Sequence, residues 1–332
     1  MAKYKTCPWL EHGIVFDHCN IVRNCSHFNP STGGRPVIYE NYHGELFDWD
    51  KFWALKNSYR ENAKRNELPS QCIDCMCLHE KECEEASSRD EKYIDRILLT
   101  PWVECNSRCL YCSAPTETFV LENTKSFKVL PVMQDFIENN VFSEDVSIDF
   151  AGGEPTIYPE FDKLLDLFVS KGFKDIVVHT NAIRFSKSIE NAIKKMGLKL
   201  LISVDSATKE MHEKIKGVKT YDQVWKSIKK YAKAQKKDKS LVRLKYIILP
   251  GVNDNRDELE KWLLKCKKTG INDVVLNIDF NWLIKYINDV PQEIRNLVND
   301  TQQKAEELGM NLVLYPQLIE IQRKYENCNC SE

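Results

Sequence analysis

The chain has 332 residues and a mass of 38.7 kDa, enough for about two domains or for one large α/β barrel with an appendage. Its 47 Lys and Arg residues against 49 Asp and Glu give a net charge of −2, which removes the usual electrostatic basis for nucleic-acid binding. Hydrophobic residues make up 42% of the chain, and its longest apolar runs are far shorter than a membrane span. The composition predicts a soluble globular protein with no membrane partner.

Cysteine is the unusual residue of this composition, with thirteen copies. The N-terminal sequence lacks the apolar stretch of a secretory signal, so we expect a cytoplasmic protein whose cysteines do not form disulfides. An odd number of cysteines at short spacings in an intracellular chain favours metal or iron–sulfur ligation. We therefore expect the function to lie where the cysteines are.

Residues 1–92 form the first predicted domain, which is rich in cysteine and poor in periodic segments apart from an amphipathic stretch near Trp49 to Asn62. A charged segment at 84–91 without large apolar residues predicts a helix end or linker, and we place the domain boundary there. We expect bound metal to hold this domain together. Its cysteines are Cys7, Cys19, Cys25, Cys72, Cys75, Cys77 and Cys83.

From Ile94 onward, short β-rich runs alternate with longer helical patterns, which predicts βαβ units and a parallel sheet. This alternation predicts an α/β fold with a partial (β/α)6 TIM-type barrel over residues 93–285, followed by a helix and strand extension over 286–332. In such a barrel, chemistry occurs at the carboxyl ends of the strands. The predicted strands lie near 96–102, 145–150, 174–179, 198–204, 241–249 and 272–280, with a possible seventh at 310–315.

Three cysteines follow the first of these strands in the spacing C-x3-C-x2-C: Cys105, Cys109 and Cys112. A structural zinc site, the alternative, needs a fourth ligand such as a second CxxC or a nearby histidine, and none lies near this loop. Three thiolates on a four-iron cluster leave one iron open to an exchangeable ligand. The spacing therefore predicts a [4Fe-4S] site at the catalytic end of the barrel.

The triplet, with Tyr111 just before its third cysteine, resembles the signature of the radical S-adenosylmethionine (SAM) superfamily. The segment Gly152-Gly153-Glu154-Pro155, after the second strand, resembles the GGEP motif of that family, in which the glycines let backbone approach the cofactor and the glutamate receives its ammonium group. The resemblance implies that the three cysteines hold the cluster and that Tyr111, Gly152, Gly153 and Glu154 contact SAM. Taken alone, Gly-Gly-Glu-Pro is also an ordinary strand-to-helix turn.

Polar residues at the ends of the third and fourth strands extend the resemblance. Thr180 and Asn181, and then Ser203 and Asp205, are similar to family positions that contact the methionine carboxylate and the ribose hydroxyls of SAM. The alternative for each is a helix cap or turn former, because these residue types are favoured there regardless of function.

The resemblance covers roughly residues 95–280 and implies reductive cleavage of SAM to a 5′-deoxyadenosyl radical, with a low-potential donor such as flavodoxin or ferredoxin. We expect that radical to abstract hydrogen from a carbohydrate-type or other polar small-molecule substrate, in an oxidation or epimerisation. A peptide-modifying maturation enzyme is one alternative, and a non-catalytic iron–sulfur electron-transfer protein is another. No side chain of the chain itself is predicted to be catalytic.

The N-terminal cysteines resemble the SPASM/twitch auxiliary-cluster modules of radical SAM enzymes, although such modules usually follow the barrel. The resemblance implies an auxiliary [4Fe-4S] cluster, and a widely spaced pair plus a CxxC is the twitch-like ligand set. A four-cysteine zinc site is the alternative. The implied ligands are Cys7, Cys25, Cys72 and Cys75, with Cys19, Cys77 and Cys83 in reserve.

Three further features are predicted to carry no chemistry. A run of lysines falls opposite Val224, Ile228 and Ala232 at helical spacing, which indicates a solvated helix face. Cys266 is expected to be a buried apolar residue. Cys328 and Cys330 lie in the polar end of the chain, where fraying is the default, with capping of a cluster in the closed enzyme as the alternative. The lysines are Lys226, Lys229, Lys230, Lys233, Lys236 and Lys237.

Overall fold

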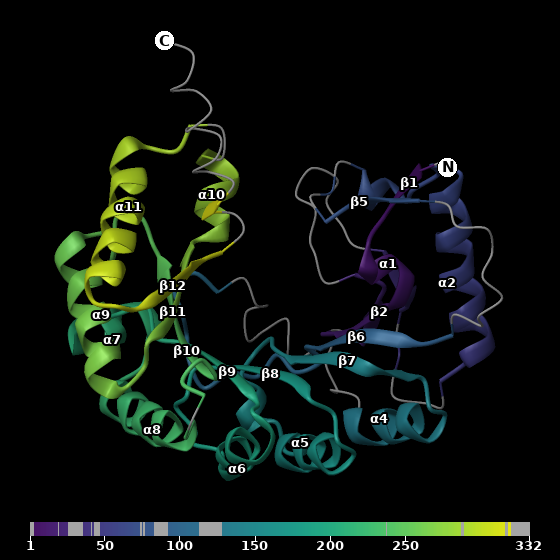
Figure 1. Ribbon diagram of the computed structural model, residues 1–332, viewed down its shortest axis with the longest axis horizontal. Helices are drawn as coiled ribbons and strands as arrows, with labels where there is room; N and C mark the ends of the chain where they lie inside the picture. Colours follow the sequence, from purple (N-terminus) through teal and green to yellow (C-terminus); the bar gives the residue numbers. More distant parts are fainter. Residues whose placement is uncertain are drawn as a thin grey trace. The chain divides into compact units, whose positions relative to one another are not determined.

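Figure 1 shows the computed structural model, in which the chain divides into two compact units. The first comprises Met1–Glu104 and Ala114–Val177, and the second comprises Cys105–Ser113 and Val178–Glu332. The predicted domain boundaries at residues 92 and 285 do not coincide with this division. The structure describes residues 3–18, 20–25, 36–40, 42, 47–73, 75, 77–82, 92–112, 128–236, 238–286, 289–315 and 318–319.

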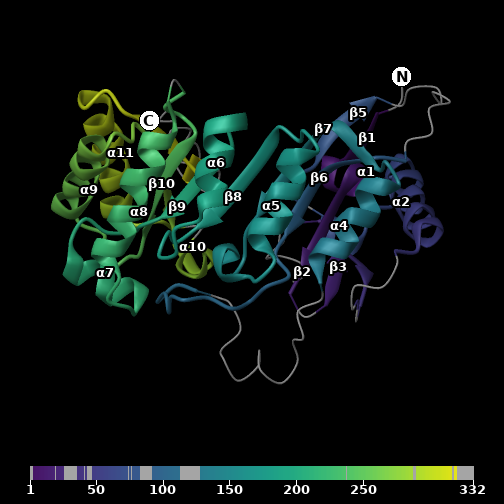
Figure 2. The same cartoon turned by 90° about the horizontal axis from the view of Figure 1, so that it is seen from below.

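The first unit contains a sheet of strand order β7-β6-β2-β3-β4 and a separate antiparallel pair, β1 with β5. Strands β7, β6 and β2 are parallel, whereas β2, β3 and β4 are antiparallel. Helices α4 and α5 lie beside β6 and β7 (Figure 2). The elements are β1 (Lys3–Thr6), α1 (Pro8–His12), β2 (Gly13–Asp17), β3 (Ile21–Arg23), β4 (Val37–Tyr39), α2 (Trp49–Lys64), η1 (Ser70–Cys72), β5 (His79–Glu82), β6 (Ile94–Leu99), α4 (Val129–Glu138), β7 (Phe142–Phe150), η2 (Pro155–Ile157) and α5 (Phe161–Ser170).

The N-terminal segment of the first unit has an apolar core of its own. All five residues of β2 are buried, and β2 adds to the parallel sheet beside β6. Phe47 stands edge-on to Phe52 and Phe136, with ring centroids 5.3 and 5.0 Å apart, and Phe16 also meets Phe136 edge-on. Edge-to-face packing of this kind stabilises a core beyond the area that it buries. Sequence reasoning missed this core and assigned the stability of the segment to metal.

The second unit holds strands in the order β12-β11-β10-β9-β8, and the pairs from β9 to β12 are parallel. The unit boundary falls inside β8. Helices α6, α8 and α9 lie on one side of these strands (Figure 1). The elements are β8 (Asp175–Thr180), α6 (Lys187–Met196), β9 (Lys199–Ser203), α7 (Lys209–Lys216), α8 (Tyr221–Ala234), β10 (Val242–Ile248), α9 (Arg256–Thr269), β11 (Asp273–Ile278), α10 (Phe280–Tyr286), α11 (Gln292–Glu307) and β12 (Asn311–Leu314).

The predicted α/β class with a parallel sheet is confirmed, because each of the seven predicted strands overlaps one of β6 to β12. Each prediction rested on a short apolar run, and alternate residues of these runs are buried, as Leu200 and Ile202 are in β9. The helices between them are bounded by ordinary cap residues: α7 starts after Thr208, whose hydroxyl accepts from Met211 N, and ends at Gly217.

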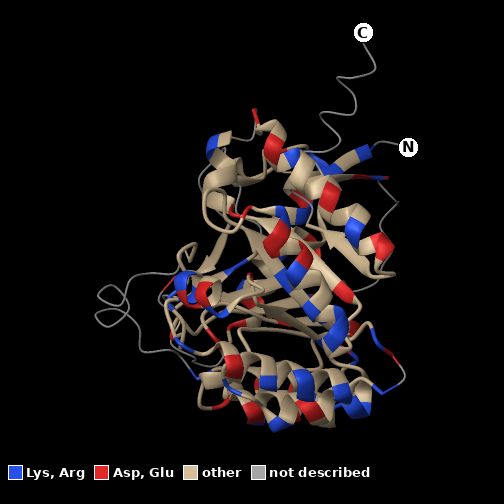
Figure 3. Cartoon of the chain, turned by 90° about the vertical axis from the view of Figure 1, so that its left-hand side faces the viewer, with Lys and Arg blue, Asp and Glu red and all other residues tan. Residues whose placement is uncertain are grey.

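The structure describes two of the three features expected to carry no chemistry, the lysine run and Cys266. Along α8 and directly after it, the lysines of the run other than Lys237 are exposed, whereas Val224, Ile228 and Ala232 are buried. Cys266 is fully buried on α9. Both Lys and Arg and Asp and Glu occur along the helices seen in Figure 3. No helix in the described part of the chain is long and apolar enough to cross a membrane. Cys19, Cys83, Cys328, Cys330, Lys237 and the segment 84–91 lie outside the described residues.

Candidate functional site

The cysteine loop, which we define as residues 105–112, belongs to the second unit and carries the three thiols of the C-x3-C-x2-C motif. Cys105 and Cys112 are exposed, Cys109 is half-buried, and all three are free thiols. The Cys109 Sγ lies 3.3 Å from the hydroxyl oxygen of Ser107. None of the three is in a disulfide, so their sulfurs can serve as ligands on one short loop.

The backbone of the cysteine loop is held by the last turn of α7. Arg108 N donates to the carbonyl of Lys216 at 2.8 Å, and Leu110 N donates to the carbonyl of Ile215 at 2.9 Å. The Ser107 hydroxyl also donates to the Lys216 carbonyl, at 3.1 Å. The last carbonyls of a helix lack partners within the helix, so these bonds satisfy groups that would otherwise be exposed.

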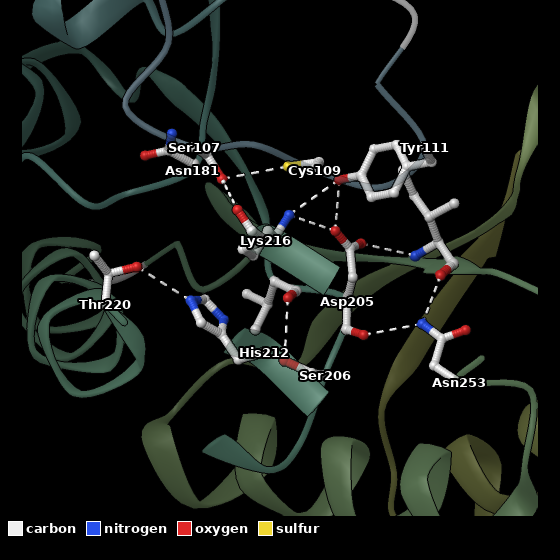
Figure 4. A network of polar contacts seen from close by, with 12 residues as sticks. Ser107, Cys109, Tyr111, Asn181, Asp205, Ser206, His212, Lys216, Thr220 and Asn253 are labelled. Atoms are coloured by element: carbon white, nitrogen blue, oxygen red, sulfur yellow. Dashed lines mark hydrogen bonds and ion pairs between the residues drawn. The ribbon is translucent and has the colours of Figure 1, made fainter. Parts of the chain in front are cut away.

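Side chains add a second connection between the cysteine loop and α7 (Figure 4). The Tyr111 hydroxyl donates to Asp205 Oδ2 at 2.6 Å, and the Lys216 ammonium is ion-paired with the same carboxylate. The Lys216 Nζ also lies 3.0 Å from the Tyr111 hydroxyl oxygen. The remaining carboxylate oxygen, Oδ1, accepts from Ile247 N at 2.9 Å. Both oxygens of Asp205 are therefore engaged by the protein itself.

Burial makes this network sensitive to the loss of any one partner. The side chains of Lys216 and Asp205 are 2% and 0% exposed. Burial lowers the pKa of Lys216, but the Asp205 carboxylate, together with Cys109 and Cys105, outweighs burial and holds the pKa above its ordinary value. Burial and the charge of Asp205 raise the pKa of Tyr111 well above its usual range, so its hydroxyl stays a donor. Removing one partner of such a buried pair typically costs about 3–5 kcal/mol.

Asn253 supports Asp205 from behind and was missed by sequence reasoning. Its Nδ2 donates to the carbonyls of Asp205 and Ile247, at 3.0 and 2.9 Å, and its Oδ1 accepts from Leu249 N at 2.7 Å. Lys216 was missed as well, because a lysine directly before a helix-ending glycine is usually a solvated cation. The available signal was its spacing: it lies four residues after His212, which is also buried.

Among the polar residues predicted at strand ends, Asn181 reaches the cysteine loop. Its Nδ2 donates to Asn106 Oδ1 at 2.7 Å and lies 3.7 Å from the Cys105 Sγ. Thr180 is buried, and its hydroxyl accepts from Ala182 N at 3.0 Å, which is the behaviour of a turn former. Ser203 is half-buried at the end of β9.

Several polar side chains of the second unit lie on neighbouring parallel strands, where buried residues such as Ile247 share their side. Lys245 is paired in register with Ser203, and Ile247, two residues on, is paired with Asn277. Burial and then the charge of Lys245 lower the pKa of His179 to about 4, which places His179 near Lys245. Burial also lowers the pKa of Lys245. We define His179, Ser203, Lys245 and Asn277, all half-buried, as the polar face.

The Gly-Gly-Glu-Pro segment forms a tight turn in the first unit, after β7. Gly152 and Gly153 have φ angles of +69° and +40°, which disfavour a side chain, and the Trp102 indole nitrogen donates to the Gly152 carbonyl at 2.9 Å. The Glu154 carboxylate is 1% exposed and accepts from the backbone and hydroxyl of Thr156, at 3.2 and 2.6 Å. Glu154 thus caps η2. This contact agrees with the alternative interpretation, in which the segment is an ordinary turn.

Gly153→Ala should destabilise the protein more than Gly172→Ala. A Cβ at Gly153 would lie 2.6 Å from the Glu104 carbonyl oxygen, whereas Gly172, at φ +83°, has no atom within 4 Å of such a Cβ. Both alanines meet a strain of roughly 1–2 kcal/mol from positive φ, and overpacking adds about 1–3 kcal/mol at Gly153 alone. Urea unfolding measures the difference. Equal losses of unfolding free energy in the two variants would show that the turn at Gly153 accommodates the extra methyl group without overpacking.

The N-terminal thiols lie near one another in the first unit. Cys7, Cys25 and Cys72 are buried, and Cys7, Cys72 and Cys77 share an apolar cluster with Leu10. Burial first, and then the neighbouring thiols, raise the pKa of Cys72 and Cys77 to about 12, and Cys75 contributes to both shifts. The structure therefore brings all four predicted auxiliary ligands into one neighbourhood and adds Cys77 to them.

The described residues thus form an α/β fold in which a loop with three thiols follows strand β6. The family model of the radical SAM superfamily matches residues 99–263, which include the cysteine loop and the Gly-Gly-Glu-Pro turn. The chain belongs to the radical SAM superfamily through this domain.

Relatives of the chain include two named GTP 3′,8-cyclases. That of Clostridium botulinum (strain Okra / Type B1) is 28% identical over 207 residues, which cover 61% of this chain and 59% of the relative. That of Haemophilus influenzae (strain PittEE) is 27% identical over 177 residues, which cover 53% and 50%. The chain thus spans between half and three-fifths of the length of these relatives.

Solved structures share the fold. Streptococcus suis SuiB bound to S-adenosylmethionine has a TM-score of 0.51 and 15% identity, covering 82% of this chain and 57% of SuiB. SuiB bound to the precursor peptide SuiA has a TM-score of 0.51 and 13% identity, covering 89% and 68%. At these identities the likeness concerns the fold alone.

The superfamily implies an iron–sulfur cluster and SAM, and the chemistry of the cysteine loop fits the cluster. Its three thiols are outside disulfides and at least partly exposed, and thiolates are the ligands that such clusters take. Within the described ranges, no three His, Cys, Asp or Glu side chains are already gathered as a metal site. The ligand side chains of both cysteine groups are therefore close in the chain or in space but not pre-arranged.

Proposed function

We propose that the protein is a radical SAM enzyme that cleaves SAM reductively and abstracts hydrogen from a polar substrate. The observation that carries the proposal is the cysteine loop, whose three cysteines lie within a domain of this superfamily and whose backbone is hydrogen-bonded to the end of α7. When bound, the cluster and SAM supply a 5′-deoxyadenosyl radical. Cys105, Cys109 and Cys112 would hold the cluster, and an electron donor of the flavodoxin or ferredoxin type would reduce it.

The chain's own residues position the cofactor and shield it from side reactions. Asn181 and Ser203 are the predicted SAM contacts that the geometry favours, because Asn181 reaches Cys105 and Ser203 lies on the polar face. Asp205 is bound by three donors of the protein and suits a supporting role better. Contacts from Tyr111, Gly152, Gly153, Glu154 and Thr180 to SAM stay predictions.

The polar face supports a polar substrate with oxygen-bearing carbon. It offers an amine, a hydroxyl, an amide and an imidazole that is neutral at pH 7, all half-buried. Such groups fix orientation through hydrogen bonds in an otherwise apolar pocket. The GTP named for the relatives combines a sugar with anionic phosphates and belongs to this class. We therefore place nucleotides and sugars, GTP first, ahead of peptides.

The experiment is anaerobic reconstitution with iron and sulfide, followed by turnover with SAM, a reductant and deuterated candidates. We expect 5′-deoxyadenosine to form and to carry deuterium from the sugar carbons of the true substrate. Label from a peptide side chain or α-carbon would overturn the polar small-molecule assignment. Absence of 5′-deoxyadenosine from cluster-loaded, reduced protein would favour a non-catalytic iron–sulfur protein instead.

A further inference from the structure

We propose that residues 215–217, at the end of α7, form a docking platform that fixes the cysteine loop before any cluster binds, with Lys216 as its positioning residue. The inference rests on the proposed function for its purpose but on the contacts of the second unit for its geometry. It assigns a role to a buried ion pair that the three cysteine ligands alone do not explain.

The contacts to the docking platform alternate with the ligands along the cysteine loop. Ser107, Arg108 and Leu110 bind the backbone carbonyls of Ile215 and Lys216. The thiols at 105, 109 and 112 fall before, between and after these anchors. The anchors are backbone groups and the Ser107 hydroxyl, so the platform fixes the loop backbone without using a cysteine sulfur for these bonds.

Lys216 joins the backbone anchors to the strands. Its ammonium bridges the Tyr111 hydroxyl of the cysteine loop and the Asp205 carboxylate after β9, and that carboxylate also binds Ile247 N on β10 (Figure 4). The pair is almost fully buried, so water cannot replace either partner. The position of the loop segment between Cys109 and Cys112 is therefore set by the strand ends through Lys216.

Helix α7 is itself fixed at its other end. The Glu258 carboxylate on α9 accepts from Ala207 N at 2.6 Å and from Thr208 N at 3.3 Å, directly before the helix begins. Glu258 is 5% exposed. Because α7 is anchored to α9 at its start, a displacement of its last turn is not simply absorbed by a shift of the whole helix.

Gly217 shows how closely the cysteine loop approaches the platform. It has a φ of +65°, and a Cβ there would lie 2.9 Å from the Arg108 carbonyl oxygen and 3.0 Å from the Arg108 Cβ. Gly270 ends α9 in the same left-handed conformation, with φ +86°, but a Cβ at Gly270 would have no atom within 4 Å. Gly217→Ala and Gly270→Ala therefore share the backbone strain, and only the first displaces the loop.

The test compares Gly217→Ala and Lys216→Met with Gly270→Ala, first in protein freed of metal. We expect the Arg108 and Leu110 amides to exchange hydrogen roughly tenfold faster in the first two variants, because their acceptors are displaced. Gly270→Ala should leave both rates unchanged. Gly217→Ala keeps the ion pair intact, so it answers the question even if Lys216→Met does not fold.

The second readout follows reconstitution. We expect Gly217→Ala and Lys216→Met to load less iron at the cysteine loop and to lose the change in the electron paramagnetic resonance spectrum that SAM produces, while Gly270→Ala retains both. Wild-type exchange rates and wild-type spectra in Gly217→Ala would overturn the proposal. Failure of wild-type protein to cleave SAM would overturn the proposed function alone, because the exchange measurement needs neither metal nor turnover.

Discussion

Replacing Cys105, Cys109 and Cys112 together by alanine is expected to abolish SAM cleavage and to remove one cluster, about four iron atoms per chain. Three thiolates are the whole protein contribution to a cluster with one open iron, so no partial site is left. The three side chains are exposed or half-buried, and none is in a disulfide. Their loss should therefore change the free energy of unfolding of metal-free protein by no more than about 0.5 kcal/mol.

Cys266→Ala is the matched control for this triple variant. Cys266 is fully buried on α9, away from the cysteine loop in the sequence, and its truncation leaves a small cavity in the core. We expect Cys266→Ala to lower the free energy of unfolding by about 1 kcal/mol while iron content and 5′-deoxyadenosine formation stay at wild-type levels. Iron analysis and chromatography of the reaction products make the comparison. Undiminished cleavage by the triple variant would refute the ligand assignment.

The parallel strands were predictable because each one is a short apolar run whose pattern is local to the sequence. Buried residues alternate along β8 and β9, and glycine ends α6, α7 and α9 where the helical pattern stops. The cysteine triplet was predictable for the same reason, since its three ligands lie within eight residues. Patterns of this kind survive without knowledge of any long-range contact.

The network around Asp205 was not predictable because its members are distant in sequence. Tyr111 lies 94 residues from Asp205 and 105 from Lys216, and no periodicity relates such positions. Local chemistry also pointed elsewhere, since lysine and asparagine near helix ends usually serve as caps or solvated groups. Only Ser203 of the polar face was among the predicted contacts, for a related reason: Lys245 interrupts an apolar strand, and its neighbours on β9 and β11 are known only from the register.

In the N-terminal segment, the cysteine motif was recognised but the apolar core was not. Its cysteines suggested a domain held by metal alone, whereas β2 pairs with β6 and Phe16 packs against Phe136 of α4. These pairings join residues more than seventy positions apart, and each strand of the segment is only three to five residues long. A metal at the N-terminal thiols would therefore add to an existing core rather than replace one.

Replacing Cys72 and Cys75 by alanine is expected to remove the metal that the triple variant retains. We propose that Cys7, Cys25, Cys72 and Cys75 hold an auxiliary [4Fe-4S] cluster, because these thiols are near enough to raise one another's pKa in a largely buried setting. In metal-free protein the double variant should lower the free energy of unfolding by only about 1 kcal/mol per cysteine. In metal-loaded protein the loss should be larger, because binding energy at such a site is also folding energy.

Cys77→Ala is the matched control, since Cys77 packs in the same apolar cluster as Cys7 and Cys72 but lies outside the proposed ligand set. In metal-free protein, Cys77→Ala should lower the free energy of unfolding about as much as one of the ligand replacements does. It should leave the iron content unchanged. The comparison separates ligation from packing, because both kinds of variant remove a sulfur from the same surroundings. Loss of iron in Cys77→Ala with retention in Cys25→Ala would transfer the fourth ligand to Cys77. Zinc in place of iron in the wild-type protein would assign the thiols to a structural site, since zinc held by four thiolates has neither an open position nor a redox change to offer.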